Sequence, residues 1–307
     1  MNTDKRARER RILVTGGGGQ IATELALAPR RDGLVPRVMT RAELDITRPD
    51  AVARAIRDVG PGLIVNAAAY TAVDAAEDNA ALAHAVNADG PGLLAEAAAA
   101  RGIPLIHLST DYVFDGEKEG AYVEDDPVRP LGVYGASKAA GEARVREATA
   151  AHVILRTAWV YSAHGRNFVK TMLRLAAGRE EIAVVADQRG APTAAGDVAA
   201  AVLRIAGAVL AGDGPWGTYH YAGAGTATWF EFAGEIFRLA APALPRAPRL
   251  VPIATRDRPD TAPRPCNSVL DCTKIEADFG LRPVPWRESL ARVVAELTAA
   301  TSTASRA

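Results

Sequence analysis

Short apolar runs alternate with longer helix-forming stretches along most of the chain, and this alternation restricts the fold more than any other feature. The runs are rich in apolar and branched residues and lie at 12–15, 37–40, 63–67, 104–109, 153–157 and 182–185. The intervening stretches are dominated by good helix formers and lie at 20–28, 51–59, 80–100 and 137–148. Because this order is typical of successive β-α-β units, the sequence predicts an α/β fold with a doubly wound parallel sheet.

Charge and cysteine content exclude several classes of protein. The 307 residues carry 36 basic and 36 acidic side chains, and zero net charge argues against nucleic acid or an anionic membrane as the principal partner. Two cysteines, Cys266 and Cys272, are too few for a disulfide framework or a four-cysteine zinc site. No run of about 18 apolar residues is free of charge, Gly and Pro, and no secretory signal is recognised. We therefore expect a soluble, cytoplasmic protein.

The first apolar run leads directly into the glycines 16–19, which are followed by Gln20 and a predicted helix. Glycines at such a turn let the backbone approach a pyrophosphate, whose charge is met by amides at the helix N-terminus. The spacing Gly16-x-x-Gly19-x-x-Ala22 departs from the plain dinucleotide fingerprint, and a flexible loop is the alternative. Its position between the first strand and the first helix favours a Rossmann-type cofactor site that includes Gly16 and Gly19.

The second predicted strand ends at Thr40-Arg41, where NAD-dependent dehydrogenases usually place an acidic residue on the ribose 2′-hydroxyl. An arginine in that position can pair with the 2′-phosphate of NADP, because guanidinium and phosphate match in a bidentate geometry. A solvated loop arginine is the alternative. We expect NADPH as the cofactor, with NADH also accepted, and Arg41 as one of its contacts.

The pattern loosens after about residue 160, where Gly and Pro interrupt 211–217 and 242–265 and amphipathic helices are predicted at 229–240 and 286–297. A chain of this length suggests about two domains. We expect a dinucleotide-binding domain at 11–160, with 193–212 packing back on it, a mainly substrate-binding, smaller α/β lobe at 161–297, and flexible termini at 1–10 and 298–307.

Tyr134 and Lys138 are four residues apart and share one face of the helix predicted there. A phenol with a pKa of about 10 is a poor catalyst at neutral pH, but a neighbouring ammonium favours the phenolate. The fourth apolar run ends in Ser109-Thr110-Asp111, whose side chains would emerge at the carboxyl edge of the sheet, where ligands bind. A surface pair on a helix is the alternative, but the order of the motifs favours Tyr134, Lys138 and Thr110 as a catalytic set.

Nine motifs follow one another between about residues 11 and 297. They are GGGGQ at 16–20, LDIT at 44–47, NAAAYTAVDAAE at 66–77, STDYVFDG at 109–116, YGASK at 134–138, RTAWVY at 156–161, NFVKTMLRLA at 167–176, DQRGAPT at 187–193 and RPCNSVLD at 264–271. Together they closely resemble the dTDP-4-dehydrorhamnose reductase family of the extended short-chain dehydrogenases/reductases. The ordered series is far more specific than any one of its motifs.

The resemblance implies reduction of the C4 keto group of dTDP-4-dehydro-6-deoxy-L-mannose (dTDP-4-dehydrorhamnose) to dTDP-L-rhamnose. In such a reaction Tyr134 donates the proton and Lys138 binds the nicotinamide ribose. The further cofactor contacts that the resemblance implies are Gly19, Gln20 and Ile21 at the pyrophosphate, Asp45 and Ile46 at the adenine, and Ala69, Tyr70 and Thr71 after the third strand. The substrate contacts that it implies are Thr110, Asp111 and, against the sugar, Trp159.

Two further groups of residues leave alternatives open. Arg264, Asn267 and Ser268 carry donors that a nucleotide diphosphate needs, but ordinary loop capping would also explain them. The five histidines show no metal-site spacing, so no metal is predicted. Glu24 matches a residue that helps to bind Mg²⁺ at a dimer contact in some relatives, and a solvated carboxylate is the alternative, which leaves both Mg²⁺ and a homodimer open.

Other functions compete with this hypothesis. A reductase of a related dTDP-4-keto-deoxysugar, from an antibiotic or dihydrostreptose-type pathway, would use the same catalytic set. A 4,6-dehydratase is disfavoured, because such relatives carry Thr-Asp-Glu where this chain has Thr110-Asp111-Tyr112. A non-catalytic regulatory subunit of the methionine adenosyltransferase β type also resembles the family, but the intact Tyr134 and Lys138 favour catalysis.

Overall fold

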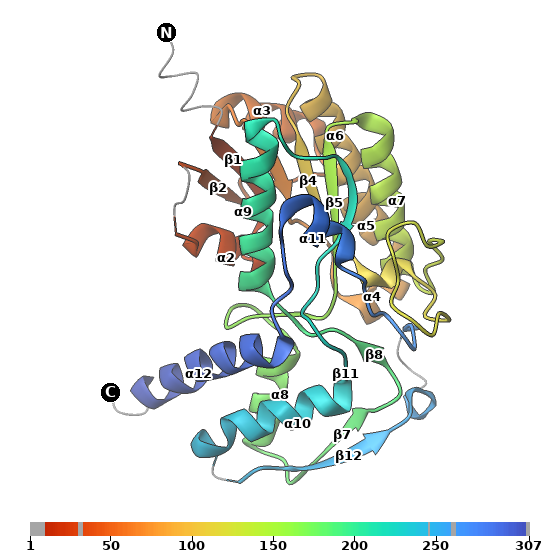
Figure 1. Cartoon of the computed structure of the whole chain (residues 1–307), viewed down its shortest axis with the longest axis vertical. Coiled ribbons are helices and arrows are strands. Elements are labelled where there is room, and N and C mark those ends of the chain that lie inside the picture. The colour runs from red at the N-terminus through yellow and green to blue at the C-terminus, as the bar shows by residue number, and fades with distance from the viewer. Residues whose placement is uncertain (1–9, 30–32, 245, 259–261, 305–307) are drawn as a thin grey trace.

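Six parallel strands form a central sheet in a computed structural model that describes residues 10–29, 33–244, 246–258 and 262–304. The strands are β1 (Arg11–Gly17), β2 (Val35–Thr40), β3 (Leu63–Asn66), β4 (Leu105–Thr110), β5 (His152–Thr157) and β10 (Gly217–His220). Their order across the sheet is β10-β5-β4-β3-β1-β2, so the chain changes direction of travel between β1 and β3 (Figure 1). The predicted doubly wound parallel sheet is confirmed.

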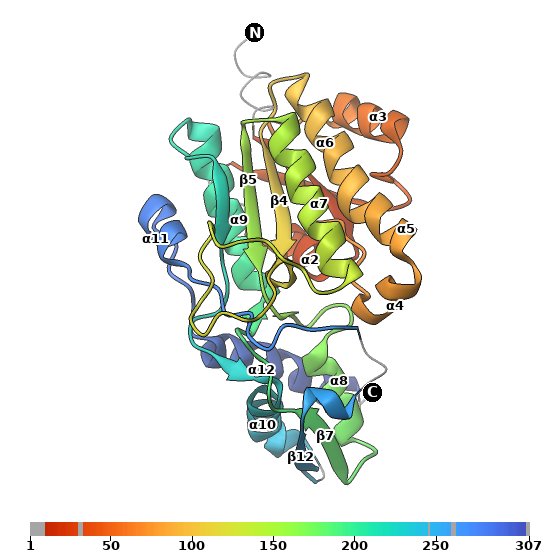
Figure 2. The same ribbon diagram turned by 90° about the vertical axis from the view of Figure 1, so that its right-hand side faces the viewer.

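Helices cover both faces of this sheet (Figure 2). Successive residues of β1 point to opposite faces, so that Ile12 and Val14 join one apolar cluster and Leu13 joins another. The first cluster includes residues of α2 (Gln20–Leu27), α9 (Ala195–Ala211) and α11 (Thr273–Phe279). The second includes residues of α3 (Pro49–Val59), α6 (Gly90–Ala99) and α7 (Val133–Ala148). Burial on both sides explains why the central strands consist of continuous apolar runs.

Short helical pieces connect β3 to α6 along the edge of the second layer. They are α4 (Val73–Asp78), α5 (Ala80–His84) and a π-helical turn at Ala85–Asp89. The sequence predicts one helix over 80–100, but the π-helical turn interrupts it. Gly141 of α7 lies so close to this turn that a methyl group there would be 2.0 Å from the carbonyl oxygen of Asn87. The glycine therefore allows α7 to pack directly on the turn.

A smaller α/β lobe lies beyond the carboxyl ends of the strands (Figures 1 and 2). Its helices are α8 (Phe168–Ala176), α10 (Trp229–Ala240) and α12 (Trp286–Ala304). Its strand pairs are β7 (Glu181–Val185) with β12 (Arg249–Ile253), β6 (Val160–Tyr161) with β9 (Thr193–Ala194), and β8 (Arg189–Gly190) with β11 (Ala227–Thr228). The lobe has its own apolar core, in which Tyr161, Phe232 and Trp286 are buried.

The structure corrects two strand assignments. Residues 182–185 belong to β7, which pairs with β12 in the lobe and not with the central sheet. Glu181 and Ala183 are exposed while Ile182 and Val184 are buried, and this alternation is typical of a sheet with one solvated face. The sixth central strand is instead β10, which the sequence places within the lobe. Its four residues, Gly-Thr-Tyr-His, form too short and too polar a run for the strand pattern to be recognised.

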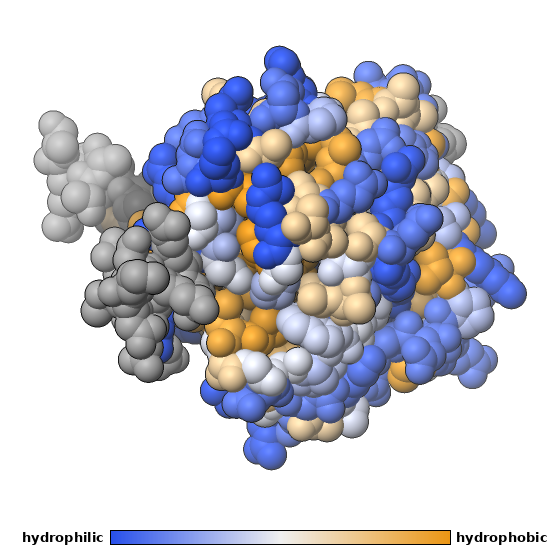
Figure 3. All heavy atoms as spheres, turned by 90° about the horizontal axis from the view of Figure 1, so that it is seen from above, coloured by the Kyte–Doolittle hydropathy of each residue, from blue (hydrophilic) through white to orange (hydrophobic). Residues whose placement is uncertain are grey.

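The chain ends were also expected to be flexible at 1–10 and 298–307. Helix α12 continues to Ala304, seven residues beyond the predicted end of the last helix. Residues 1–9 and 305–307 lie outside the described residues. None of the described helices is long and apolar enough to cross a membrane. On the end of the molecule opposite the lobe, hydrophobic and hydrophilic residues are interspersed (Figure 3).

Candidate active site

The glycine turn lies where the strand order changes direction, between β1 and β3. Gly16 has a φ of +79°, and a methyl group on it would lie 2.6 Å from the carbonyl carbon of Ala67. Gly18 has a φ of +90° with open space beside it, and Gly19 begins α2 without any side-chain cap. The first amides of α2 are therefore free to bind an anion, and no side chain blocks the turn. This cradle fits a dinucleotide pyrophosphate.

Gln20 contributes to this site through its backbone, because its side chain is used elsewhere. Its Nε2 donates to the carbonyl of Val160 at 3.3 Å, and its Oε1 accepts from Asn167 Nδ2 at 2.9 Å and from Ser162 Oγ at 3.3 Å. These bonds connect the glycine turn to the first segment of the lobe. Ile21 follows in the first turn of α2 and is half-buried.

Arg41 follows β2 beside the glycine turn, since Thr40 pairs with Gly17. Its guanidinium is 76% exposed and lies 3.8 Å from Asp45, so it is accessible to a phosphate group. The Asp45 carboxylate also accepts hydrogen bonds from the Thr47 hydroxyl and amide, which hold its pKa below the usual range. Ile46, in contrast, is 3% exposed and packs in the core beneath Gly90, so its side chain does not line an open site.

The segment after β3 is held by a residue that sequence analysis did not single out. Asn87, in the π-helical turn, accepts from the amide of Tyr70 at 2.7 Å and donates to the carbonyl of Tyr70 at 3.0 Å. Its Nδ2 also donates to Ser137 Oγ at 3.0 Å. Asn87 thereby connects residues 69–71, predicted to line the cofactor, to the helix that carries the catalytic pair. A lone buried amide in an alanine-rich helix is the signal that could have identified it.

Thr110 and Asp111 lie at the carboxyl end of β4 and are both buried. Thr110 Oγ1 donates to Asp111 Oδ1 at 2.9 Å and accepts from the Tyr112 amide at 3.2 Å. Asp111 Oδ2 is buried without a hydrogen-bond partner among the described residues. Burial raises the pKa of this carboxyl to about 7, although the hydroxyls of Ser268 and Thr110 act in the opposite direction. Asp111 is therefore a buried acid that exchanges a proton near neutral pH.

Tyr134 lies in the first turn of α7, and its phenol is close to Thr110 and Asp111. Burial raises its pKa to about 12, which the Thr110 hydroxyl opposes and the Asp111 carboxyl reinforces. Its ring contacts the Tyr112 ring edge to face, with 5.9 Å between centroids. The expected effect of Lys138, which would bring the phenol toward ionisation, is outweighed by burial. The phenol stays protonated at neutral pH, which suits a proton donor.

Lys138 is 2% exposed and follows Tyr134 by one turn of α7. Its Nζ donates to the carbonyl of Leu108 at 2.6 Å and lies 3.5 Å from His107 Nε2. Burial lowers its pKa to about 8, while the carboxylate of Glu142, one turn further along, acts in the opposite direction. Glu142 is itself paired with the buried Arg156 at 2.8 Å. The lysine is thus close to the balance between ammonium and amine at a moderately alkaline pH.

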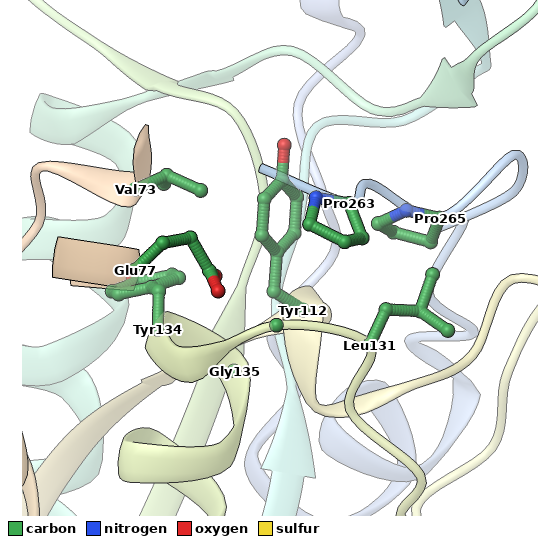
Figure 4. A pocket seen from close by; sticks show the side chains of 9 residues that line it. Val73, Glu77, Tyr112, Leu131, Tyr134, Gly135, Pro263 and Pro265 are labelled. Carbon is green, nitrogen blue, oxygen red and sulfur yellow. The ribbon is translucent and has the colours of Figure 1, made fainter. Parts of the chain in front are cut away.

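A small pocket opens between α4, the start of α7 and the segment 263–265 (Figure 4). The phenol of Tyr112 lies in it, and burial raises the pKa of that phenol above its usual range. Glu77 of α4 accepts a hydrogen bond from the amide of Val133 at 2.9 Å, which caps the first turn of α7. Glu77 is a second residue that sequence analysis did not single out. Its bond orients the helix turn that carries Tyr134.

Trp159 has a φ of +46°, in the left-handed region that is uncommon outside glycine. Its indole stacks on that of Trp229 with 3.6 Å between centroids and 7° between planes. A methyl group on Gly190 would lie 2.4 Å from the Trp159 ring, so the glycine backbone also lies against it. Trp229 Nε1 donates to Gln188 at 3.2 Å. The structure therefore encloses Trp159, leaving it 9% exposed.

The residues proposed to bind the diphosphate differ in how many N–H donors remain free for a ligand. Asn267 Nδ2 donates to the carbonyls of Lys118 and Gly120 at 2.7 and 2.9 Å, and its Oδ1 accepts from the Val269 amide. Both N–H donors of the Asn267 side chain are therefore used within the protein. This agrees with the alternative that Asn267 caps a loop. Arg264 pairs with Asp74 of α4 at 2.8 Å and is partly exposed, so it still offers N–H groups on the site side of α4.

Comparison with known proteins agrees with this geometry. The family described as RmlD substrate binding domain matches residues 10–299. A dTDP-4-dehydrorhamnose reductase of Sinorhizobium fredii is 46% identical over 286 residues, covering 92% of this chain and 96% of that protein. The chain belongs to the dTDP-4-dehydrorhamnose reductase family.

Two further similar proteins give information on the cofactor and the substrate. The crystal structure of dTDP-4-dehydrorhamnose reductase from Bacillus anthracis in complex with NADP superimposes with a TM-score of 0.87 at 36% identity, covering 94% of this chain and 99% of that one. A probable dTDP-4,6-dihydroxy-2-methyloxan-3-one 4-ketoreductase of Streptomyces antibioticus is 42% identical over 294 residues, covering 94% and 96% of the two chains. The family thus includes proteins named for different dTDP-sugars.

For this member of the reductase family, the described residues hold no group of three or more His, Cys, Asp or Glu side chains that could bind a metal ion. Glu24 of α2 lies 3.9 Å from His164. Burial raises the pKa of Glu24, which His164 opposes and the carboxylates of Glu296 and Asp197 reinforce.

Proposed function

We propose that the chain reduces the C4 keto group of dTDP-4-dehydro-6-deoxy-L-mannose (dTDP-4-dehydrorhamnose) with NADPH, producing dTDP-L-rhamnose. The observation that carries the proposal is the protonated, half-buried phenol of Tyr134 beside Thr110, at the sheet edge next to an open glycine turn. A phenol of this kind can give a proton to a carbonyl oxygen but cannot remove one at neutral pH. The names of the relatives supply the substrate class.

The residues act on the carbonyl oxygen of the substrate. When bound, NADPH supplies the hydride. Tyr134 donates its phenolic proton to the oxygen at C4. The Thr110 hydroxyl, which donates to Asp111 in the structure, turns its proton toward the same oxygen and orients it by a hydrogen bond. The Lys138 ammonium stabilises the phenolate that Tyr134 becomes and binds the ribose hydroxyls. The protein thus orients the groups and moves one proton.

The cofactor occupies the switch point of the sheet in this proposal. Residues 11–160, with 193–212, form the dinucleotide-binding part, and 161–297 mainly provide the substrate lobe. Arg41 pairs with the 2′-phosphate, which its exposure allows, and NADH is accepted less well. The cofactor contacts are Gly16, Gly19, Gln20, Ile21, Arg41, Asp45, Ala69, Tyr70, Thr71, Tyr134, Lys138 and, through its backbone because its side chain lies in the core, Ile46. The substrate contacts are Thr110, Asp111, Trp159 and Arg264, with Asn267 holding the loop beside them.

Initial rates of NADPH oxidation with dTDP-4-dehydrorhamnose test the proposal. We expect turnover that depends on the keto sugar, and a lower kcat/KM with NADH. No oxidation at any concentration of sugar would reject the activity. It would favour the regulatory-subunit alternative, against which Tyr134 and Lys138 argue, since a non-catalytic protein needs neither.

A second substrate is favoured by one specific observation. The Streptomyces antibioticus relative is named for another dTDP-linked keto sugar and is about as similar to this chain as the rhamnose-forming relatives. The same catalytic set would reduce it. Comparing kcat/KM for the two dTDP-sugars separates these possibilities, and we expect dTDP-4-dehydrorhamnose to be preferred.

We also infer a homodimer and a cytoplasmic location. The two cysteines, Cys266 and Cys272, are free thiols, as a reducing compartment would leave them. Light scattering on the purified protein tests the dimer, and a monomeric mass at working concentration would reject it. Neither inference affects the catalytic proposal.

A further inference from the structure

A continuous row of polar side chains crosses the carboxyl half of the sheet, from the glycine turn to the lysine. Thr15 of β1 donates to Asn66 of β3 at 2.6 Å, Asn66 contacts His107 of β4 at 3.0 Å, and His107 lies 3.5 Å from Lys138. All four residues are buried. Because buried polar groups are costly unless they are paired, the direction of each hydrogen bond can be derived from its neighbours.

The orientation of the Asn66 amide follows from the backbone. The amide N–H of Ala68 donates to Thr15 Oγ1 at 3.1 Å and to Asn66 Oδ1 at 3.3 Å. Thr15 therefore uses its own hydroxyl proton toward Asn66 Oδ1. A reversed Asn66 would place its NH₂ group against the Ala68 N–H group and would leave the Thr15 hydroxyl proton without its acceptor. The oxygen of Asn66 must face Thr15, and its NH₂ group must face His107.

This orientation determines the tautomer of His107. Its Nδ1 faces the NH₂ group of Asn66, so it must accept a hydrogen bond and carry no proton. The ring is fully buried, and burial, together with the Lys138 charge, lowers its pKa well below the usual range. His107 is thus neutral, with its single ring proton on Nε2. That N–H group is the one that faces Lys138.

The contact between His107 and a charged Lys138 consequently joins two donors, and it is the one contact of this row in which the buried groups are not paired. An ammonium has no acceptor capacity, so it gains no hydrogen bond from this ring. The carbonyl of Leu108 is its one acceptor among the described residues. We propose that His107 is a positioning residue for Lys138, which presents an N–H group to the ammonium and so leaves the other ammonium protons for groups bound on the site side.

The surrounding charges agree with this assignment. Tyr134 and Glu142 are the titratable groups of the same helix near Lys138, and His107 is the one on β4. The Glu142 carboxylate favours the ammonium, but its charge is shared with Arg156 and Arg146. Burial lowers the pKa of Lys138 to about 8, against the attraction of the Glu142 carboxylate. A bound ribose would supply the missing acceptors.

The inference rests on the proposed function for its meaning, but its test needs neither cofactor nor substrate. The wild-type chain has five histidines, so ¹⁵N spectra of histidine-labelled protein can resolve each ring. We expect His107 to have a bare Nδ1 and a protonated Nε2, unchanged between about pH 5 and pH 9, a range that spans the usual histidine pKa. The signal is assigned by its loss in His107→Leu. A protonated Nδ1, or titration within this range, would overturn the proposal.

Lysine spectra measure the consequence for Lys138. The chain has five lysines, and the ¹³Cε signal of Lys138 is identified by its absence in Lys138→Met. In His107→Leu the opposing N–H group is gone, so we expect the midpoint of Lys138 to rise by about 0.5 to 1 pH unit. His152→Leu, a half-buried histidine at the start of β5, is the matched control and should leave it unchanged. A lower midpoint of Lys138 in His107→Leu would mean that the ring had accepted a hydrogen bond from the ammonium. That result would overturn the proposal.

A second variant acts from a distance. In Asn66→Asp the introduced carboxylate can only accept a hydrogen bond, which favours the tautomer of His107 with its ring proton on Nδ1, so Nε2 becomes an acceptor for the ammonium. We expect the ¹⁵N pattern to reverse and the Lys138 midpoint to rise by about one unit or more. An unchanged ring pattern would overturn the relay. Failure of the proposed reduction would instead appear as absent NADPH oxidation in the wild type, and it would leave these spectra as they are.

Discussion

The carboxyl edge of the central sheet and the Trp159–Trp229 region of the lobe both belong to the proposed site, but they are built differently. At the sheet edge, each functional side chain lies directly after a strand or in the first turn of a helix, and the parallel topology brings them together. In the lobe, Trp159 owes its position to Trp229, which is 70 residues away, and to the bare backbone of Gly190. The first region is organised by topology, the second by long-range packing.

This difference predicts different responses to substitution. At the sheet edge, removing one functional group should remove only the contribution of that group, to chemistry at Tyr134 or to NADPH binding at Arg41, because the backbone positions the remaining groups. In the lobe, a small change in shape should affect substrate binding, because packing alone positions the indole. The four predictions below are ordered by the size of the expected effect.

Tyr134→Phe should lower kcat by about 10²- to 10⁴-fold, because the proton donor is lost. The NADPH dissociation constant should change little, since the ring remains in place. Steady-state kinetics and fluorescence titration measure the two quantities. Tyr161→Phe, which removes a buried hydroxyl in the lobe, is the control and should retain most of the activity. Near-normal turnover of Tyr134→Phe would refute the assignment.

Asp111→Asn should make the protein more stable at pH 8 and leave its stability at about pH 4 unchanged. The folded pKa of about 7 is above the unfolded value, so the folded state holds a proton that it must lose as pH rises between them. The wild type therefore loses up to about 4 kcal/mol over that range, which the amide avoids. Urea unfolding at the two pH values measures the difference.

Asp115→Asn is a control for which we expect a stability change of the opposite sign at pH 8. Hydrogen bonds from Tyr122 and the Glu117 amide lower the pKa of Asp115, so its contribution is present at pH 8 and is lost as pH falls. This variant should be less stable than the wild type at pH 8. Equal shifts for both aspartate variants would show that burial of Asp111 has no electrostatic cost.

Arg41→Ala should lower kcat/KM for NADPH by about 10- to 150-fold, the value of a charge-assisted contact of about 1.5 to 3 kcal/mol. Activity with NADH should barely change, because NADH has no 2′-phosphate. The ratio of the two values, at one ionic strength, is the quantity to measure. Arg37→Ala, in the strand β2 that precedes Arg41, is the control, because Arg37 is paired with Glu43. A constant ratio would make Arg41 a solvated loop residue.

Gly190→Ala should raise the KM for the dTDP-sugar by about 5- to 150-fold, which corresponds to about 1 to 3 kcal/mol of overpacking. The new methyl group would meet the Trp159 ring at 2.4 Å and displace it. Binding of NADPH should not change. Gly178→Ala, in the same lobe with open space beside it, is the control. An unchanged KM would remove Trp159 from the substrate site.

The same contrast explains which parts of the site and the fold could be predicted from the sequence. Gly16, Thr110, Tyr134 and Lys138 could be predicted because strand ends of a parallel sheet coincide, so motif order alone brings them together. Asn87 and His107 could not, because their roles depend on partners from other elements that no local pattern specifies. The strand β10 was missed for a related reason, since pairing with β5 stabilises a segment with weak strand character of its own.

Transfer of a deuterium label tests the central claim most directly. With NADPH deuterated on the transferring face of the nicotinamide and dTDP-4-dehydrorhamnose as substrate, the product should be dTDP-L-rhamnose that carries deuterium on C4. The hydroxyl proton should come from the protein and solvent. NMR of the purified product reads both the label and the configuration. Deuterium absent from C4, or the opposite configuration at C4, would contradict the account.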